Sequence, residues 1–130
     1  MHRVVGLAAI ALALTACGAG AGTAARGPIA FGIRGGNVLE YRITIQPTGS
    51  VRVKGAEAAR QRIRPTRARR LRNVILTADL RSVACSGVLP DVASRYVRVD
   101  GRTVTVHGEC APSFERVWTD LTQAVDLHSA

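Results

Sequence analysis

The chain has 130 residues, of which 47% are hydrophobic, and a formal net charge of +9 at pH 7. This length fits one small domain, and the sequence contains no glycine-rich phosphate loop, no H-E-x-x-H motif and no G-x-S-x-G motif. Because the acidic residues are scattered singly and no nucleophile has a positioned base, the sequence predicts a protein that is not an enzyme and has no metal and no cofactor.

The N-terminus is typical of an exported, lipid-modified protein. A short basic start precedes an apolar run from Val4 to Leu14, which is too short to cross a bilayer because a membrane helix needs about 20 apolar residues. The next residues, Leu14-Thr15-Ala16-Cys17, resemble the lipobox of bacterial lipoproteins. The resemblance implies that residues 1–16 are a signal peptide and that the sulfur of Cys17 carries a diacylglyceryl group. The alternative is an ordinary secretory signal that is cut after Ala21.

Residues 17–27 are rich in Gly and Ala and have no hydrophobic period, so we expect a flexible tether. Ten such residues span ~17 Å by random-coil scaling. Residues 28–130 then form a single domain, which is held at the extracytoplasmic face of the cell membrane through the lipid on Cys17.

Three cysteines occur in the chain. If Cys17 carries the lipid, Cys85 and Cys110 remain as a pair, and export to an oxidising compartment predicts a disulfide between them. The alternatives are a metal site or a thiol nucleophile. Neither is supported, because no C-x-x-C spacing is present and only two histidines, His107 and His128, follow the predicted signal peptide.

The first half of the domain alternates like a sheet. We expect a strand at 28–34, a break at the glycines 35–36, and a second strand at 37–46. Four apolar residues of the second strand share one face: Leu39, Tyr41, Ile43 and Ile45. The residues 47–50 predict a turn, and 51–54 a third strand. Residues 55–65 show no clear pattern.

The second half contains two helical periods and a hairpin. Thr66 is expected to cap a helix that runs to about Ala78, and Pro112 to begin the last helix. The apolar positions of the first helix are Ala68, Leu71, Val74, Ile75 and Ala78, and those of the last are Phe114, Val117, Trp118, Leu121 and Val125. We expect the latter to be core, and a stacking role for Trp118 in a binding site is the alternative.

Between these helices, residues 96–107 predict a hairpin. Asp100-Gly101 is a favoured two-residue turn, which places Val97 opposite Val104. The other face of this hairpin then carries Tyr96, Arg98, Thr103, Thr105 and His107. The whole order is β-β-β-α-β-β-α, an α+β domain whose antiparallel sheet has two helices packed on one face.

This order of elements, with the segments Phe31-Gly32-Ile33-Arg34-Gly35-Gly36, Thr77-Ala78-Asp79-Leu80 and Leu89-Pro90, resembles emfourin-type small proteins. Emfourin inhibits thermolysin-like metallopeptidases. The resemblance covers nearly the whole domain and implies a fold and an inhibitory activity, but it assigns no individual inhibitory residue.

The positive charge is concentrated in one part of the chain. Residues 17–72 hold twelve basic and two acidic residues, whereas residues 73–130 hold five basic and seven acidic residues. The basic segment, as we call it, has nine members: Arg52, Lys54, Arg60, Arg62, Arg64, Arg67, Arg69, Arg70 and Arg72.

Three explanations of the basic segment are open. The first is coding bias, because the chain has seventeen Arg and one Lys. The second is attraction to anionic lipid near the anchor, and the third is an acidic partner such as a wall polymer or a protein surface. Nucleic acid is not expected, because the chain is predicted to be exported and the segment has no aromatic residue for base stacking.

These observations predict a lipid-anchored, extracytoplasmic binding domain that is not an enzyme. The alternative is a surface-held protease inhibitor of the emfourin type. A thiol enzyme is a third class, since His107 and Glu109 lie close to Cys110 in sequence. However, a cysteine that is bound in a disulfide is not a resting nucleophile.

Overall fold

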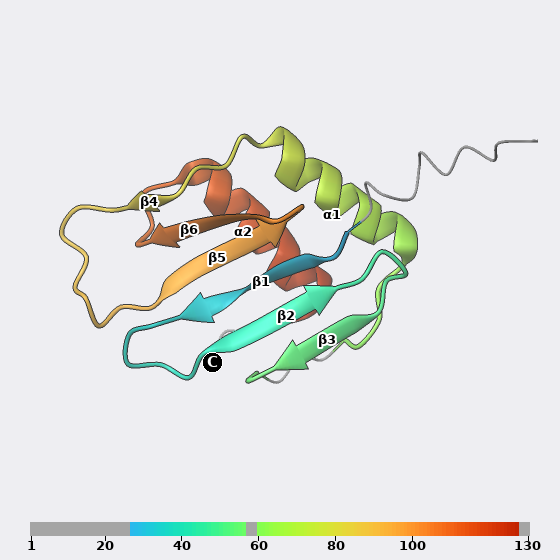
Figure 1. Ribbon diagram of the computed structural model, residues 1–130, viewed down its shortest axis with the longest axis horizontal. Coiled ribbons are helices and arrows are strands. Elements are labelled where there is room, and N and C mark those ends of the chain that lie inside the picture. The colour runs from blue at the N-terminus through green and yellow to red at the C-terminus, as the bar shows by residue number, and fades with distance from the viewer. Residues whose placement is uncertain (1–26, 57–59, 128–130) are drawn as a thin grey trace, which may run out of the picture.

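The computed structural model describes residues 27–56 and 60–127, and in these ranges the chain forms a six-stranded sheet and two helices (Figure 1). The elements are β1 Ile29–Arg34, β2 Tyr41–Ile45, β3 Val51–Lys54, α1 Pro65–Thr77, β4 Val83–Ala84, β5 Ser94–Val99, β6 Arg102–His107 and α2 Pro112–Ala124. The sheet order is β3-β2-β1-β5-β6-β4, and both helices lie on one face of the sheet. The α+β fold with two helices on one face is thus confirmed.

The core lies between the sheet and the two helices. Phe31 on β1 is paired with Ile43 on β2, and both side chains are 0% exposed. Helix α2 covers them with Phe114, which is also buried, and with Trp118, whose ring meets Phe31 edge-on at 5.7 Å between centroids. Trp118 therefore packs against the core, as its helical spacing predicted.

The hairpin of β5 and β6 has the predicted register. Val97 is paired with Val104, and the two turn residues Asp100 and Gly101 have φ of 54° and 75°. A type I′ turn requires positive φ at both central residues, and such turns are favoured because the twist of the turn matches the twist of the two strands.

The predicted second strand is too long at its N-terminal end. β2 begins at Tyr41, and Leu39 is 88% exposed instead of facing the core. The segment before it is a loop, because Gly35 and Gly36 have φ of 72° and 67° and the Gly35 N–H donates to the Glu40 carboxylate at 2.9 Å. A hydrogen bond also joins this loop to the loop before β5: the Asn37 N–H donates to the Asp91 carbonyl at 3.0 Å.

Helix α1 begins earlier than predicted. Its first residue is Pro65, so Thr66 lies inside the helix and is not its cap, and the Arg64 side chain at the cap position makes no capping bond. Proline suits the first helical position because its missing N–H would have no partner there.

Two segments without a sequence pattern join the sheet by pairing. β4 has only two residues and lies parallel to β6, so it is too short to show alternation and makes the sheet mixed. Before α1, the Ile63 N–H donates to the Gly49 carbonyl at 2.8 Å, and Ile63 is buried in the core. Backbone pairing with the edges of the sheet thus fixes the position of segments that have no hydrophobic pattern of their own.

Several predictions lie outside the described residues, namely the signal peptide, the lipid site Cys17 and the tether up to Arg26. Within the described ranges, neither helix is long and apolar enough to pass through a bilayer. The described residues start at Gly27, two residues before β1.

Candidate binding site on the open sheet face

One face of the sheet is covered by the helices, and we call the other face the open face (Figure 1). Strand alternation gives it polar and small side chains. Strand pairing aligns these side chains in two rows that cross β3, β2, β1, β5 and β6. The first row is Lys54, Arg42, Gly32, Tyr96 and Thr105, and the second is Arg52, Thr44, Ala30, Arg98 and Thr103.

The small residues of β1 leave a hollow in the middle of the open face. Its volume is about 850 Å³, and Ala30 lies in its lining. Gly32 cannot be larger, because a Cβ at this position would lie 2.0 Å from the Tyr41 carbonyl oxygen and 3.1 Å from the Tyr96 hydroxyl. The neighbouring strand and Tyr96 therefore leave no room for a side chain at position 32.

The hollow is lined by cations. The basic residues in its wall are Arg34, Arg42, Lys54 and Arg98, and the acidic ones are Glu40 and Asp100. Both acids lie outside the strands, and each already has a partner. Asp100 binds Arg72, and Glu40 accepts the N–H of Gly35. The open face of the strands, all of which lie in the described ranges, carries no acidic side chain.

Tyr96 organises two of these cations. Its side chain is nearly buried, at 7% exposure, and its hydroxyl accepts a hydrogen bond from Arg42 Nε at 3.2 Å. The guanidinium of Arg34 lies over the same ring, 5.2 Å from its centroid, and donates to the Thr105 hydroxyl at 2.8 Å. The hydrogen bond from Arg42 to Tyr96 raises the pKa of Arg42 above its ordinary value. Tyr96 thus fixes both guanidinium groups on the open face.

A second tyrosine, Tyr41, borders the hollow, but strand alternation places its side chain with Ile43 and Ile45 on the helix side of the sheet. Burial raises its pKa above the ordinary value of 10.0, although the positive charge of Arg95 acts in the opposite direction. The phenol of Tyr41 therefore belongs to the packing on the helix side, and Tyr96 is the tyrosine that faces the hollow.

The residues of the predicted basic segment lie on different surfaces of the protein. Arg52 and Lys54 lie on the open face, whereas another hollow of about 610 Å³ between α1 and α2 is lined by Arg60, Arg64, Arg67 and Arg70 together with Asp120. Arg62 is paired with Ser50 beside β3, and Arg69 lines a shallow depression near Pro47. The nine residues therefore do not form one patch.

Arg72 is not available to a partner. It is only 8% exposed, and its guanidinium binds both carboxylate oxygens of Asp100 at 2.5 Å and the Gly27 carbonyl at 3.3 Å. Its assignment to an anion-binding patch is therefore wrong. It joins α1 to the β5–β6 turn and to the start of the described chain.

The sequence reasoning missed Arg34, Arg42 and Arg98, which lie far apart along the chain. Alternation did place Arg42, Tyr96 and Arg98 on the polar faces of their strands. What it lacked was the pairing of β1 with both β2 and β5, which joins the two polar faces across Gly32.

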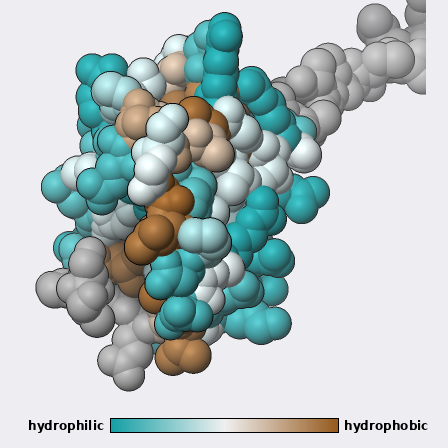
Figure 2. Space-filling view, turned by 90° about the vertical axis from the view of Figure 1, so that its left-hand side faces the viewer, coloured by the Kyte–Doolittle hydropathy of each residue, from teal (hydrophilic) through white to brown (hydrophobic). Residues whose placement is uncertain are grey.

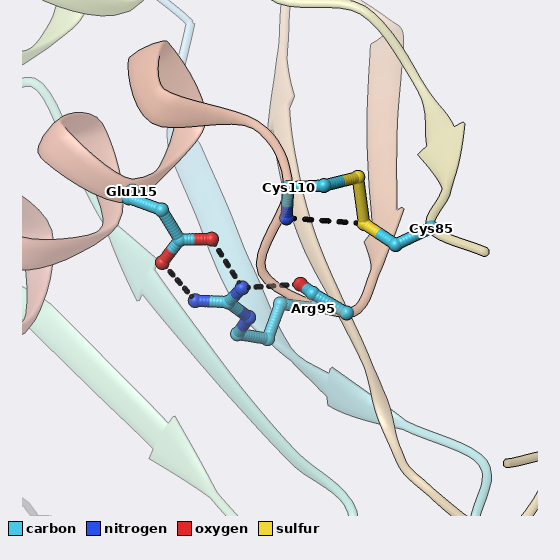
Figure 3. Close-up of polar contacts among 5 residues, drawn as sticks. Cys85, Arg95, Cys110 and Glu115 are labelled. Atoms are coloured by element: carbon cyan, nitrogen blue, oxygen red, sulfur yellow. Dashed lines mark hydrogen bonds and ion pairs between the residues drawn. A yellow bond between two sulfur atoms is a disulfide. The ribbon is translucent and has the colours of Figure 1, made fainter. Parts of the chain in front are cut away.

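The predicted disulfide between Cys85 and Cys110 is present, with 5.8 Å between the two Cα atoms (Figure 3). Cys110 therefore offers no thiolate. His107 is also engaged, because its Nδ1 lies 3.1 Å from the Ser94 hydroxyl and its Nε2 lies 3.2 Å from the Leu89 carbonyl. In the part of the chain that the structure describes, no group of His, Cys, Asp and Glu side chains could hold a metal ion.

Apolar side chains are exposed at one end of the molecule. The loop before β2 and the loop before β5 lie together there, and they expose Val38, Leu39, Leu89 and Val92, which we call the apolar tip. Figure 2 looks at this end and shows a band of hydrophobic surface between hydrophilic areas. β1 runs from Ile29 toward the tip, so the start of this strand lies about 20 Å from the tip for a strand of six residues (Figure 1).

Comparison of the chain with protein-family models, with curated proteins and with solved structures finds no match.

Proposed function

We propose that this protein is a lipid-anchored, extracytoplasmic binding domain that is not an enzyme and that holds its ligand on the open face. The observation that carries the proposal is the hollow beside Ala30, with four basic residues in its wall. Binding pockets have volumes of about 300–1,000 Å³, and that of the hollow lies in this range.

The arrangement of charges around the hollow lowers the stability of the fold, so stability does not explain it. Arg42 and Lys54 are directly opposite each other on β2 and β3, and like charges in this position destabilise a strand pair. Among the described residues, Lys54 and Arg98 make no ion pair and no side-chain hydrogen bond. A bound anion would remove this repulsion, which supports binding as the role of the face.

The anchor is tested at Cys17. Replacing Cys17 with alanine removes the sulfur that would carry the lipid, so we expect most of the protein to move from the membrane fraction to the soluble fraction. Fractionation of cells followed by immunoblotting measures this, with the exposed Arg116→Gln as the control variant. Unchanged membrane retention of the Cys17→Ala protein would reject the anchor.

Binding on the open face is tested by reversing its charge. We expect the double variant Arg42→Glu/Arg98→Glu, purified from native membranes, to retain at least tenfold less of the non-protein material that the wild type carries. Mass spectrometry and carbohydrate and phosphorus analysis of the purified proteins measure this material. The matched control is Arg81→Glu/Arg116→Glu, which has the same net charge but changes two exposed arginines outside the hollow. Equal retention by the two double variants would refute the open face as the binding surface.

A second candidate function is a surface-held inhibitor of metallopeptidases, and the apolar tip favours it. Exposed apolar loops such as these could enter the cleft of another protein. The residual activity of thermolysin-like peptidases in the presence of the full chain separates this candidate from the first.

A further inference from the structure

We infer that the ligand of the open face is a phosphomonoester of a sugar or polyol, which enters the hollow with its phosphate between Arg42 and Lys54. The inference rests on the proposed function of the open face and adds the chemical class of the ligand.

The guanidinium group of Arg42 is held in place and has free donors for an anion. Its Nε is occupied by the Tyr96 hydroxyl, while no described residue accepts a hydrogen bond from its two terminal nitrogens. A guanidinium group that is held on one side offers its remaining N–H groups in a fixed, planar arrangement, which matches the oxygens of a phosphate or carboxylate. Because Tyr96 already fixes the group, little side-chain entropy is lost on binding.

Lys54 provides a second charge at the same place. It is the direct cross-strand neighbour of Arg42, so both cations can reach one anionic group. A phosphomonoester carries a charge of about −1.5 to −2 at pH 7, whereas a carboxylate carries −1. Two adjacent cations that lack an acidic partner among the described residues are therefore better matched by phosphate.

The far wall of the hollow requires a ligand that is larger than phosphate itself. Arg98 lies on β5, two strands away from Arg42, which corresponds to about 10 Å between the strands. Two hydroxyl groups also line the hollow: that of Thr44, on β2 with Arg42, and that of Thr103, the cross-strand neighbour of Arg98 on β6. Both can donate and accept hydrogen bonds. A hydroxyl-rich body of sugar size fills this distance and pairs with these groups.

The shape of the face favours a single molecule over a bilayer. The cations surround a hollow, and Arg34 lies down on the Tyr96 ring instead of extending outward. A flat layer of lipid headgroups cannot enter such a hollow, whereas one phosphorylated molecule can. The open face is thus a ligand site, and lipid attraction is a competing outcome that the test resolves.

The test is isothermal titration of the full chain in neutral detergent with glucose 6-phosphate. We expect its Kd to be at least tenfold lower than those of glucose, inorganic phosphate and glucuronate, the last of which replaces the phosphate with a carboxylate. We expect Arg42→Gln, Lys54→Gln and Arg98→Gln each to raise this Kd about tenfold or more, since each removes a charged hydrogen-bond donor. The exposed control Arg116→Gln should leave it unchanged.

Two further variants separate positioning from charge. Arg42→Lys keeps the charge but loses the planar group, so its Kd should still rise severalfold. Tyr96→Phe removes the hydroxyl that positions Arg42 without removing charge. Its Kd should therefore rise while the dependence of the Kd on salt stays that of the wild type, whereas the three glutamine variants should weaken that dependence. Circular dichroism melting of each variant verifies that it is folded.

Three results would overturn the inference: no binding of glucose 6-phosphate at millimolar concentration, equal Kd values for glucuronate and glucose 6-phosphate, or competition by phosphatidylglycerol vesicles that the same variants abolish. In each case the proposed binding function survives if Arg42→Glu/Arg98→Glu still loses the material that co-purifies from membranes. If that material is retained, both proposals fail.

Discussion

Replacing both Cys85 and Cys110 with serine is expected to lower the free energy of unfolding by about 3.5 kcal/mol. The bond closes a loop with a sequence separation of 25 and joins the end of β4 to the residues before α2. Opening that loop increases the entropy of the unfolded chain, and the expected loss follows from this increase. Urea denaturation of the wild type and the double variant, followed by circular dichroism, measures it.

Thiol labelling provides the control for this prediction. In unreduced protein unfolded in urea, neither Cys85 nor Cys110 should react, and both should react after reduction. Reduction of the wild type should also lower the urea midpoint to about that of the double serine variant. If the double variant were as stable as the oxidised wild type, the disulfide would have no stabilising role.

Replacing Arg95 with methionine is expected to cost up to about 3 kcal/mol, the lower end of the range for a buried ion pair, because the side chain of Glu115 is 33% exposed. Arg95 points from β5 to the helix side, with 16% of its side chain exposed, and donates to both carboxylate oxygens of Glu115 at 2.5 and 2.7 Å (Figure 3). It also donates to the Gly108 carbonyl at 2.7 Å. The variant would leave Glu115 and this carbonyl without their donor.

The guanidinium of Arg95 also lies over two rings of α2, at 5.4 Å from the centroid of Phe114 and 5.5 Å from that of Trp118. We therefore expect the double variant Arg95→Met/Glu115→Leu to be more stable than Arg95→Met alone, because it removes the unpaired carboxylate and keeps apolar contact. Chemical denaturation of the single and double variants gives the coupling energy. Arg116→Met, an exposed change on the same helix, should alter stability by no more than about 0.5 kcal/mol. A similarly small effect of Arg95→Met would contradict the structural role of the ion pair.

Local patterns in the sequence predicted much of the fold. Alternation located β3 and the β5–β6 hairpin, and the Asp100-Gly101 turn set the register of Val97 with Val104. Helical spacing identified α2, and the cysteine count predicted the disulfide. These features succeed because turn geometry and one buried face act over a few neighbouring residues.

The candidate site was less predictable, because its parts lie on separate strands. The basic segment is the strongest local signal of charge, yet Arg72 within it is a buried structural residue and the Arg60, Arg64, Arg67 and Arg70 group faces a different hollow. Arg42 and Arg98 are 56 positions apart in the sequence and are brought to one hollow by β1.

The sequence by itself determined which residues of the β5–β6 hairpin share a face, since a strand that is covered on one side alternates with a period of two. The prediction of a lipid anchor also comes from the sequence alone, because it depends on the residues Leu14-Thr15-Ala16-Cys17. Only the tertiary structure decided which polar faces meet, because strand pairing joins residues through hydrogen bonds of the backbone, which carry no side-chain signal. The hollow beside Ala30 therefore exists only in the assembled sheet.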